Sequence, residues 1–430
     1  MRGCRIRRSC RQFFRPWHWR CKRVQGVFVG PSFLRGRVTP PPSKSMAHRV
    51  LISAALAGMP LEEVEKRGLG RELGEDIQAT IDCLRALGAP GQDPLILDCR
   101  ESGSTLRFLL PVAAALGRSA VFTGSQGLAR RPLREYVSIL GSGGVRLEFR
   151  GEENLPVRVE GRLQGGVFPV PGHVSSQYIT GLMLALPLVE GDSTIYLTSP
   201  LQSAPYVQLT QVVLAQFGVV VDALEGCDGN AAGWSVAGKQ SYRIPPKPLV
   251  LEADYSQAAF WLAARFLGHE VEVDGLNPHS VQGDRAILPL LEEMASWPPG
   301  EELRISAAQI PDLVPILAVA ACARRGATVI EQAERLRLKE SDRLHSTTEM
   351  LRAMGAQITA ADDALIIEGG KQLPGGQVHS HNDHRIAMAA AIAALSSRDG
   401  VRIIGAAAVS KSYPNFFQEL KRLGGDVRGI

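Results

Sequence analysis

The chain has 430 residues, of which 45% are apolar and 21% charged, proportions typical of globular proteins. Its formal net charge is +5, but residues 1–23 hold eight Arg and one Lys without an acid, and removing these nine leaves 39 basic residues against 43 acidic. The rest of the chain is therefore mildly acidic, which excludes a general affinity for nucleic acid. No apolar run reaches the roughly 18 residues of a membrane span, and a chain this long favours two domains.

The basic segment 1–23 is predicted to be a disordered tail. A transit peptide is the alternative, but the interleaved Trp17, His18 and Trp19 form no clear amphipathic stripe and no signal-peptide core. The seven Cys are scattered along the chain without a C-x-x-C pair. A disulfide framework or a zinc site is therefore not expected, and a reducing cytoplasm fits this pattern.

After the tail, one pattern recurs along the chain. Six times a Ser, Asp or Asn opens an apolar run of about a dozen residues, and the first five runs close on Gly. A capping residue, a buried face and a Gly stop predict an α-helix. The starts lie very roughly 55 to 80 residues apart, which indicates one supersecondary unit used six times. The predicted helices begin near Ser43, Ser102, Ser175, Asp254, Asp312 and Asn382.

Short alternating runs between these helices predict strands and hence a mixed α/β fold. The first lies within 27–38, and others are 166–170, 193–197, 269–273, 302–305, 327–330 and 401–404. Residues 61–75 stand where the repeat requires a strand, but charge dominates them and their apolar spacing is irregular, so no strand is assigned there.

Two proline clusters, at 40–42 and 245–248, predict two crossings of the chain between domains. One domain would then be 43–246. The other would combine 24–42 with 247–430. Each domain would contain three of the six repeats, and 1–23 would remain outside both.

The predicted helix starts collect cationic and hydroxyl side chains, which favours anionic ligands, because helix N-termini attract anions. Neither G-x-x-x-x-G-K-[ST] nor a G-x-G-x-x-G after a strand is present, so anion binding would depend on these scattered groups. Lys44 and Arg49 share one helix start, where their repulsion costs free energy until an anion arrives. The other candidates are Ser45, Gly103, Ser104, Arg107, Arg130, Arg131, Ser175, Ser176, Gln177, Lys339, Arg343, His384, Arg385 and Lys411.

Each candidate also has an ordinary explanation. A single cation is usually solvated, Gly103 suits a turn, and the serines at 175 and 176 suit helix caps. Asp312 is explained as the cap of the fifth helix. Glu340 lies between Lys339 and Arg343, where an ion pair accounts for it. The two acids become acid–base candidates only if the fold brings them into one cleft.

Seven sequence words carry a resemblance: PPSKSMAHR, SGSTLR, ARRP, VSSQ, LKESDR, NDHRIAM and SKSYPNFF. In this order they closely resemble the signatures of the 5-enolpyruvylshikimate-3-phosphate synthase (3-phosphoshikimate 1-carboxyvinyltransferase) family. The resemblance implies two inside-out α/β domains, each of three βαβαββ units, that close around substrate. It also implies transfer of the enolpyruvyl group of phosphoenolpyruvate to the 5-hydroxyl of shikimate 3-phosphate, with release of phosphate, on the pathway to chorismate and aromatic amino acids. No metal or organic cofactor is implied.

The resemblance also implies roles for individual residues. Asp312 would accept the proton of the 5-hydroxyl, and Glu340, with Lys44 and His384, would protonate the methylene carbon. Shikimate 3-phosphate would contact Lys44, Ser45, Arg49, Ser175, Ser176, Gln177, Ser203, Tyr206, Asp312 and Lys339. Phosphoenolpyruvate would contact Lys44, Gly103, Arg131, Gln177, Arg343, Arg385 and Lys411. The expected protein is a cytoplasmic monomer that binds these small molecules and neither nucleic acid nor membrane.

The chain departs from the family's pattern in two places. Arg335 stands where many members have Asn, and Gly-Ser replaces the commoner Gly-Thr at 103 and 104. In the family, glyphosate competes for the phosphoenolpyruvate site, and Gly103 keeps that space open, so inhibition by glyphosate is expected.

Three other functions stay open at this point. The sister carboxyvinyltransferase acting on UDP-N-acetylglucosamine has a first-helix word resembling G-A-K-N and a loop Cys, whereas this chain has Ser-Lys-Ser and the loop GSQGLARRP. A non-catalytic homologue would bind shikimate phosphates without turnover, although the retained Lys44, Asp312, Glu340 and Lys411 argue against it. A nucleic-acid binder using the tail would bind in a salt-sensitive way that depends on 1–23.

Overall fold

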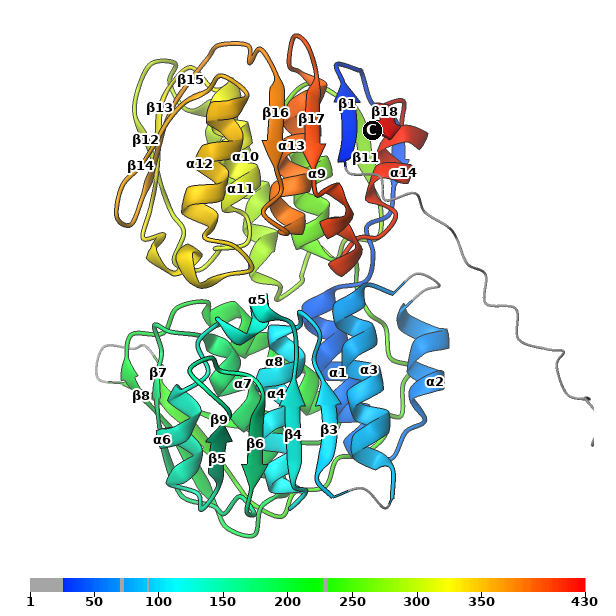
Figure 1. The fold of residues 1–430 in the computed structure, drawn as a ribbon, viewed down its shortest axis with the longest axis vertical. Helices are drawn as coiled ribbons and strands as arrows, with labels where there is room; N and C mark the ends of the chain where they lie inside the picture. The colour runs from blue at the N-terminus through cyan, green and yellow to red at the C-terminus, as the bar shows by residue number, and fades with distance from the viewer. Residues whose placement is uncertain (1–25, 70–72, 91–92, 227–230, 430) are drawn as a thin grey trace, which may run out of the picture.

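The computed structural model describes residues 26–69, 73–90, 93–226 and 231–429. Two halves stand one above the other, and the chain passes between them twice (Figure 1). The two crossing segments lie side by side, since Ser43 donates its backbone amide to Glu252 and Asp254 donates its own to Pro41. The predicted tail at 1–23 lies outside the described residues. No helix within the described ranges is long and apolar enough to cross a membrane.

Each half has its own buried core. One core is built from apolar residues between Met46 and Tyr242. The other combines Val29, Leu34 and Val38 with residues between Tyr255 and Leu423. The domain division into 43–246 and 24–42 plus 247–430 stays a prediction, which these two separate cores support.

Four four-stranded sheets in the described residues share one topology, in which a parallel pair is followed by two antiparallel strands. One half contains β3 (Leu95–Asp98), β4 (Ala120–Thr123), β6 (Val157–Glu160), β5 (Arg146–Phe149) and β7 (Val167–Pro171), β8 (Ser193–Ser199), β10 (Ala231–Val236), β9 (Asp222–Glu225). The other contains β12 (Leu303–Ser306), β13 (Gly326–Glu331), β15 (Leu365–Gly369), β14 (Gln357–Ala360) and β16 (Gly376–His379), β17 (Val401–Ile404), β1 (Gly26–Gly30), β18 (Asp426–Gly429). A further sheet is the parallel pair of β2 (Arg35–Val38) and β11 (Glu270–Val273). The repetition predicted from the helix starts is therefore visible in the sheets.

One strand prediction requires correction, and the segment to which no strand was assigned is helical in its described part. The strand expected within 27–38 is two strands, because the chain turns after Gly30 and β1 and β2 join different sheets. Near 61–75, where the repeat requires a strand but none is assigned, the described part forms the short helix α2 (Leu61–Val64) and a π-helical turn (Glu65–Leu69). The spacing of the buried Leu61, Val64 and Leu69 is not the alternation of a half-buried strand.

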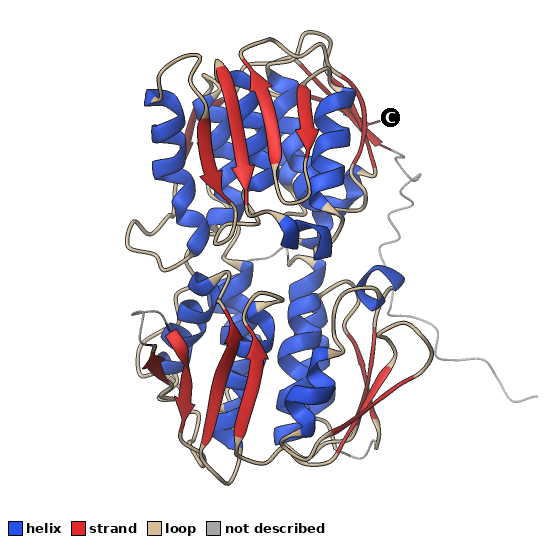
Figure 2. Ribbon diagram, turned by 90° about the vertical axis from the view of Figure 1, so that its left-hand side faces the viewer, coloured by secondary structure: helices blue, strands red, loops and turns tan. Residues whose placement is uncertain are grey.

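In each half the helices run inside and the sheets face outward (Figure 2). The six predicted helices are α1 (Lys44–Leu56), α4 (Gly103–Ala115), α7 (Ser176–Ala185), α9 (Tyr255–Phe266), α11 (Val314–Ala323) and α13 (His384–Leu395). The remaining helices are α3 (Glu75–Gly88), α5 (Gln126–Ala129), α6 (Glu135–Gly141), α8 (Ala204–Gln216), α10 (Ile287–Ser296), α12 (Arg343–Ala353) and α14 (Phe416–Arg422). Short 3-10 turns are η2 (Leu186–Leu188), η3 (Gly283–Ala286), η4 (Glu334–Leu338) and η5 (Ala406–Lys411).

The predicted helix caps are mostly confirmed. The side chains of Ser43, Ser102, Ser175 and Asp254 each accept a hydrogen bond from an amide two or three residues further on. The cap of α13 is Asp383, one residue after the predicted start at 382. The predicted cap of α11 is wrong, because Leu313 occupies that position and the Asp312 carboxylate is used elsewhere.

Candidate active site

A cavity of about 980 Å³, including its open mouth, lies between the two halves. First-turn residues of α1, α4, α7, α9 and α13 all contribute to its wall, so several positive helix ends point into one space. The predicted residues that line it are Lys44, Ser45, Arg49, Arg131, Ser175, Ser176, Gln177, Ser203, Tyr206, Asp312, Lys339, Glu340 and Arg385. The anion-binding candidates Ser104 and Arg107 line it as well, and so does Arg335.

Four predicted residues lie behind this wall or beside it: Gly103, Arg343, His384 and Lys411. Gly103 leaves room for two guanidinium groups, because a Cβ there would stand 2.8 Å from Arg131 Nη1 and 2.9 Å from Arg107 Nη1. The candidate Arg130 is exposed and does not line the cavity.

In the half built around α1, α4 and α7, polar contacts fix the orientation of the lining residues. Lys44 Nζ lies 2.8 Å from Asp76 Oδ2. Arg49 donates from Nε to Thr210 Oγ1 at 2.8 Å and from Nη2 to the Tyr206 carbonyl at 2.9 Å. Burial lowers the pKa of Arg49 to about 9. Arg49 therefore remains a cation at neutral pH.

The amide side chain of Gln177 is fixed from both sides. Its Oε1 accepts from Arg107 Nη1 at 2.7 Å, and its Nε2 donates to Ser104 Oγ at 3.0 Å. Ser175 caps the same helix, α7. At the start of α8, Ser203 adopts a left-handed conformation with φ 58. Two helix starts therefore bring serine hydroxyls to one wall of the cavity.

In the other half, one arginine organises the acids. The side chain of Arg343 is 1% exposed and reaches Asp312 at 2.7 Å, Glu340 at 2.6 Å and Asp383 at 2.8 Å. Asp312 also accepts a hydrogen bond from Arg385 Nη2 at 2.9 Å, and its Oδ1 lies 3.6 Å from Lys339 Nζ. The two acid–base candidates are thereby held in one buried ionic network.

The protonation states follow from these contacts. Burial alone would raise the pKa of Asp312, but Arg385, Lys339 and Arg343 hold it well below its usual range. Burial would also raise the pKa of Glu340, but the charges of Arg343 and Arg131 outweigh this effect. The pKa of Glu340 is therefore well below its usual range as well. Both carboxylates are therefore ionised at neutral pH in the ligand-free protein.

Two buried bases have lowered pKa values. Burial and the nearby Lys44 lower the pKa of His384 to about 3, so the imidazole is neutral at neutral pH. Neither of its ring nitrogens has a hydrogen-bond partner among the described residues. Burial lowers the pKa of Lys339 to about 8. Of His384 and Lys339, Lys339 is therefore the one whose protonation state changes closer to neutral pH.

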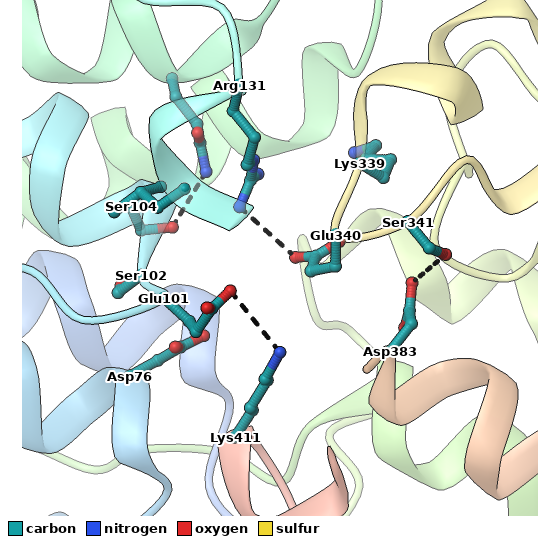
Figure 3. Close-up of polar contacts among 12 residues, drawn as sticks. Asp76, Glu101, Ser102, Ser104, Arg131, Lys339, Glu340, Ser341, Asp383 and Lys411 are labelled. Atoms are coloured by element: carbon teal, nitrogen blue, oxygen red, sulfur yellow. Dashed lines mark hydrogen bonds and ion pairs between the residues drawn. The ribbon is translucent and has the colours of Figure 1, made fainter. Parts of the chain in front are cut away.

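Ion pairs also join the two halves (Figure 3). Arg131 Nη1 lies 3.9 Å from Glu340 Oε1, and Lys411 Nζ lies 3.6 Å from Glu101 Oε2. Lys411 also donates to the Asn382 carbonyl at 2.6 Å. Side chains far apart in sequence therefore meet at the boundary between the halves.

Sequence reasoning assigned no role to several acidic residues of this site: Asp76, Glu101, Asp284 and Asp383. Asp383 lies inside the word NDHRIAM, so its motif could have indicated it. Asp284 contacts Ser256 and lies 3.4 Å from Tyr206 Oη, and burial raises its pKa to about 6. Asp284 and Asp76 carry no local signal, because their partners lie elsewhere in the sequence.

The arrangement suits a reaction between two anions. Lysines and arginines from both halves surround one cavity, and they can neutralise ligands that would otherwise repel each other. Two ionised carboxylates at the same cavity provide groups that can exchange protons with a bound substrate. A cavity with both features suits the binding of two anionic ligands and proton transfer to or from them.

Solved structures of similar fold define the class. EPSP synthase from Acinetobacter baumannii superposes with a TM-score of 0.71 and 25% identity, covering 94% of this chain and 99% of that one. The enolpyruvyl transferase NikO from Streptomyces tendae has a TM-score of 0.70 and 17% identity over 94% of this chain and 98% of that one, which concerns the fold alone. The chain has the enolpyruvyl transferase fold, as predicted.

Sequence comparison identifies the family. The family model described as EPSP synthase (3-phosphoshikimate 1-carboxyvinyltransferase) matches residues 29–420. The 3-phosphoshikimate 1-carboxyvinyltransferase of Clostridium acetobutylicum is 39% identical, covering 93% of this chain and 98% of its own length. That of Clostridium perfringens is also 39% identical, over 94% and 100%. The chain belongs to the EPSP synthase family and is a transferase.

Proposed function

We propose that the protein transfers the enolpyruvyl group of phosphoenolpyruvate to the 5-hydroxyl of shikimate 3-phosphate and releases phosphate. Relatives that bear this activity in their name are 39% identical over nearly the whole chain. One observation carries the proposal: the cavity combines cations from both halves with the ionised Asp312 and Glu340. The protein then acts on the pathway to chorismate and aromatic amino acids.

Each substrate has a set of suitable groups. The phosphate of shikimate 3-phosphate would lie against the hydroxyls of Ser175, Ser176 and Ser203, where the N-terminus of α7 adds unpaired amides. Phosphoenolpyruvate would lie among the cations at the boundary between the halves, which are Lys44, Arg131, Arg343, Arg385 and Lys411. Gln177 lies between the two sets and would touch both ligands.

The reaction is an addition followed by an elimination. The 5-hydroxyl oxygen bonds to C2 of phosphoenolpyruvate and loses its proton to Asp312, while C3 gains a proton and becomes a methyl group. The C2–O bond to phosphate then breaks, and C3 gives up a proton to restore the double bond. Asp312 is ionised, as a general base must be.

Glu340 is the group that would protonate C3. Its carboxylate is ionised before substrates bind, but two bound anions would add negative charge nearby and would also interact with Arg343 and Arg131. Both effects raise the pKa of Glu340. His384 is neutral, and its ring is buried behind the cavity. We therefore assign the proton transfer to Glu340, with Lys44 beside it, rather than to an imidazolium at 384.

We also infer that the protein acts as a monomer in the cytoplasm. All the groups that the mechanism uses come from one chain. The cysteines described, Cys83, Cys99 and Cys322, are free and buried, which suits a reducing compartment.

Phosphate release tests the proposed function directly. With phosphoenolpyruvate present, the purified protein is expected to release phosphate when shikimate 3-phosphate is added and not when UDP-N-acetylglucosamine is added. A reaction without an acceptor is the control. Phosphate release with the nucleotide sugar would favour the sister activity. Binding of shikimate 3-phosphate without phosphate release would indicate the non-catalytic homologue.

Lys411→Met is expected to raise the KM for phosphoenolpyruvate at least about tenfold, or to abolish turnover, because a buried cation at the proposed site is lost. Shikimate 3-phosphate should still bind, which calorimetry measures. The matched control is Lys421→Met, because Lys421 is exposed on α14. Unchanged kinetics of the Lys411 variant would refute its assignment to the phosphoenolpyruvate site.

A further inference from the structure

Asp284 and Tyr206 meet beside the cavity, where the two halves touch. Asp284 belongs to η3, in the half that contains Asp312, and Tyr206 belongs to the first turn of α8, in the other half. The two elements pack closely, because a Cβ added at Gly283 would stand 2.8 Å from Pro205 Cβ. The Tyr206 hydroxyl group is therefore held next to the acids of the opposite half.

The Tyr206 hydroxyl group faces two carboxylates and has one proton to donate. Its Oη lies 3.1 Å from Asp312 Oδ2 and 3.4 Å from Asp284 Oδ2. Burial and the charges of Asp284 and Asp312 hold the pKa of Tyr206 well above its usual range, so the phenol keeps this proton. Rotation about the C–O bond of the phenol is enough to direct the proton to either acid. In the ligand-free protein the shorter distance favours Asp312.

Asp312 has little free acceptor capacity while Tyr206 donates to it. Its Oδ2 also accepts from Arg385 Nη2 at 2.9 Å, and a carboxylate oxygen accepts about two hydrogen bonds. Its Oδ1 accepts from Arg343 Nη1 at 2.7 Å and lies 3.6 Å from Lys339 Nζ. A substrate hydroxyl group that binds to this carboxylate must therefore displace one of its donors. Tyr206 is the donor that can turn away without leaving a cation unpaired.

Asp284 can take over as the acceptor of the phenol proton. Asp284 is 3% exposed, its Oδ2 accepts from Ser256, and its Oδ1 has no hydrogen-bond partner among the described residues. Burial and the charge of Asp312 raise the pKa of Asp284 to about 6. Asp254 adds to this effect, and Arg385 and the hydrogen bond from Ser256 oppose it. At neutral pH Asp284 is therefore a carboxylate with unused acceptor capacity.

We propose that Asp284 is a positioning residue that accepts the hydrogen bond of the Tyr206 hydroxyl group when the substrate hydroxyl group binds to Asp312. The inference rests on the proposed function and deepens it. The turn of one O–H bond frees a lone pair of Asp312 Oδ2 for the 5-hydroxyl, while Arg385 and Arg343 stay in place. The exchange needs both halves together, because Tyr206 and Asp284 come from different ones.

A double-mutant cycle tests this role. Asp284→Ala is expected to lower kcat about 10- to 100-fold, as for a lost hydrogen bond to a charged group, because Tyr206 then competes with the substrate for Asp312. In a Tyr206→Phe background the same substitution should lower kcat by less than about threefold, since no hydroxyl group is left to turn away. Asp274→Ala is the matched control, because Asp274 is exposed, and its kcat should stay within about twofold of the wild type. Phosphate release at saturating substrates gives each kcat.

Equal losses in both backgrounds would mean that Asp284 has a purely structural role and would overturn the inference, as would an unchanged kcat of Asp284→Ala. If thermal unfolding shows that Asp284→Ala does not fold, Asp284→Asn decides, because it keeps the shape of the side chain. The wild-type kcat should fall as the pH drops through the pKa of Asp284, since the protonated acid is a weaker acceptor, and Asp284→Asn should lack this step. The same step in Asp284→Asn would overturn the inference.

The wild-type protein tests the proposed function separately. Phosphate release with shikimate 3-phosphate supports that function. Release with UDP-N-acetylglucosamine alone overturns it, and the cycle measured with that acceptor then decides the role of Asp284. Turnover with neither acceptor would overturn both.

Discussion

Asp312→Asn is expected to lower kcat at least about a hundredfold while shikimate 3-phosphate still binds. Asparagine keeps the shape of the side chain and one oxygen for the neighbouring cations, but it cannot accept the proton of the 5-hydroxyl. The ionised state of Asp312 depends on Arg385, Lys339 and Arg343, all of which remain in the variant. Steady-state kinetics give kcat, and calorimetry gives the affinity.

The control for this substitution is Asp362→Asn. Asp362 is exposed and its carboxylate is outside the cavity, so its kinetics should match the wild type. If Asp312→Asn turned over at a near-normal rate, Asp312 could not be the general base. A loss of shikimate 3-phosphate binding equal to the loss in kcat would instead indicate a role in binding.

Arg343→Met is expected to reduce the free energy of unfolding by about 3–5 kcal/mol, because it leaves three carboxylates of one buried network without their shared cation. These carboxylates are Asp312, Glu340 and Asp383. Urea denaturation at neutral pH measures the loss. The deficit should shrink as the pH falls through the pKa values of these acids in the variant, since protonation removes their mutual repulsion.

Arg402→Met is the matched control for that measurement. Arg402 is exposed on β17, so its removal should cost less than about 1 kcal/mol. A similarly small loss for Arg343→Met would mean that the three acids find other partners or take up protons at little cost. The network would then not depend on Arg343.

Local signals predicted the helices well. The caps at Ser43, Ser102, Ser175 and Asp254 were found because a cap and its helix are adjacent in sequence. The prediction of a single strand within 27–38 is wrong, because the alternation of apolar and polar residues continues across the turn that separates β1 from β2. The topology of the sheets depends on pairings between distant segments, which a single sequence does not contain.

The interpretation of Asp312 shows the same limit at the site. Its position before an apolar run predicts a cap. In the structure the carboxylate instead accepts hydrogen bonds from Arg343 and Arg385, which lie 31 and 73 residues further along the chain. Asp76 and Glu101 were missed because their partners, Lys44 and Lys411, are adjacent only in space. The motifs indicated which cations matter, and the fold decided which acids balance them.

Residues close together along the chain were enough to predict the six helix starts, the cationic and hydroxyl side chains placed on them, and the family. The folded structure was needed to show that these starts surround one cavity and that Asp312 and Glu340 are ionised. Burial and charge interactions depend on distances through space, and those distances are established only when the chain folds.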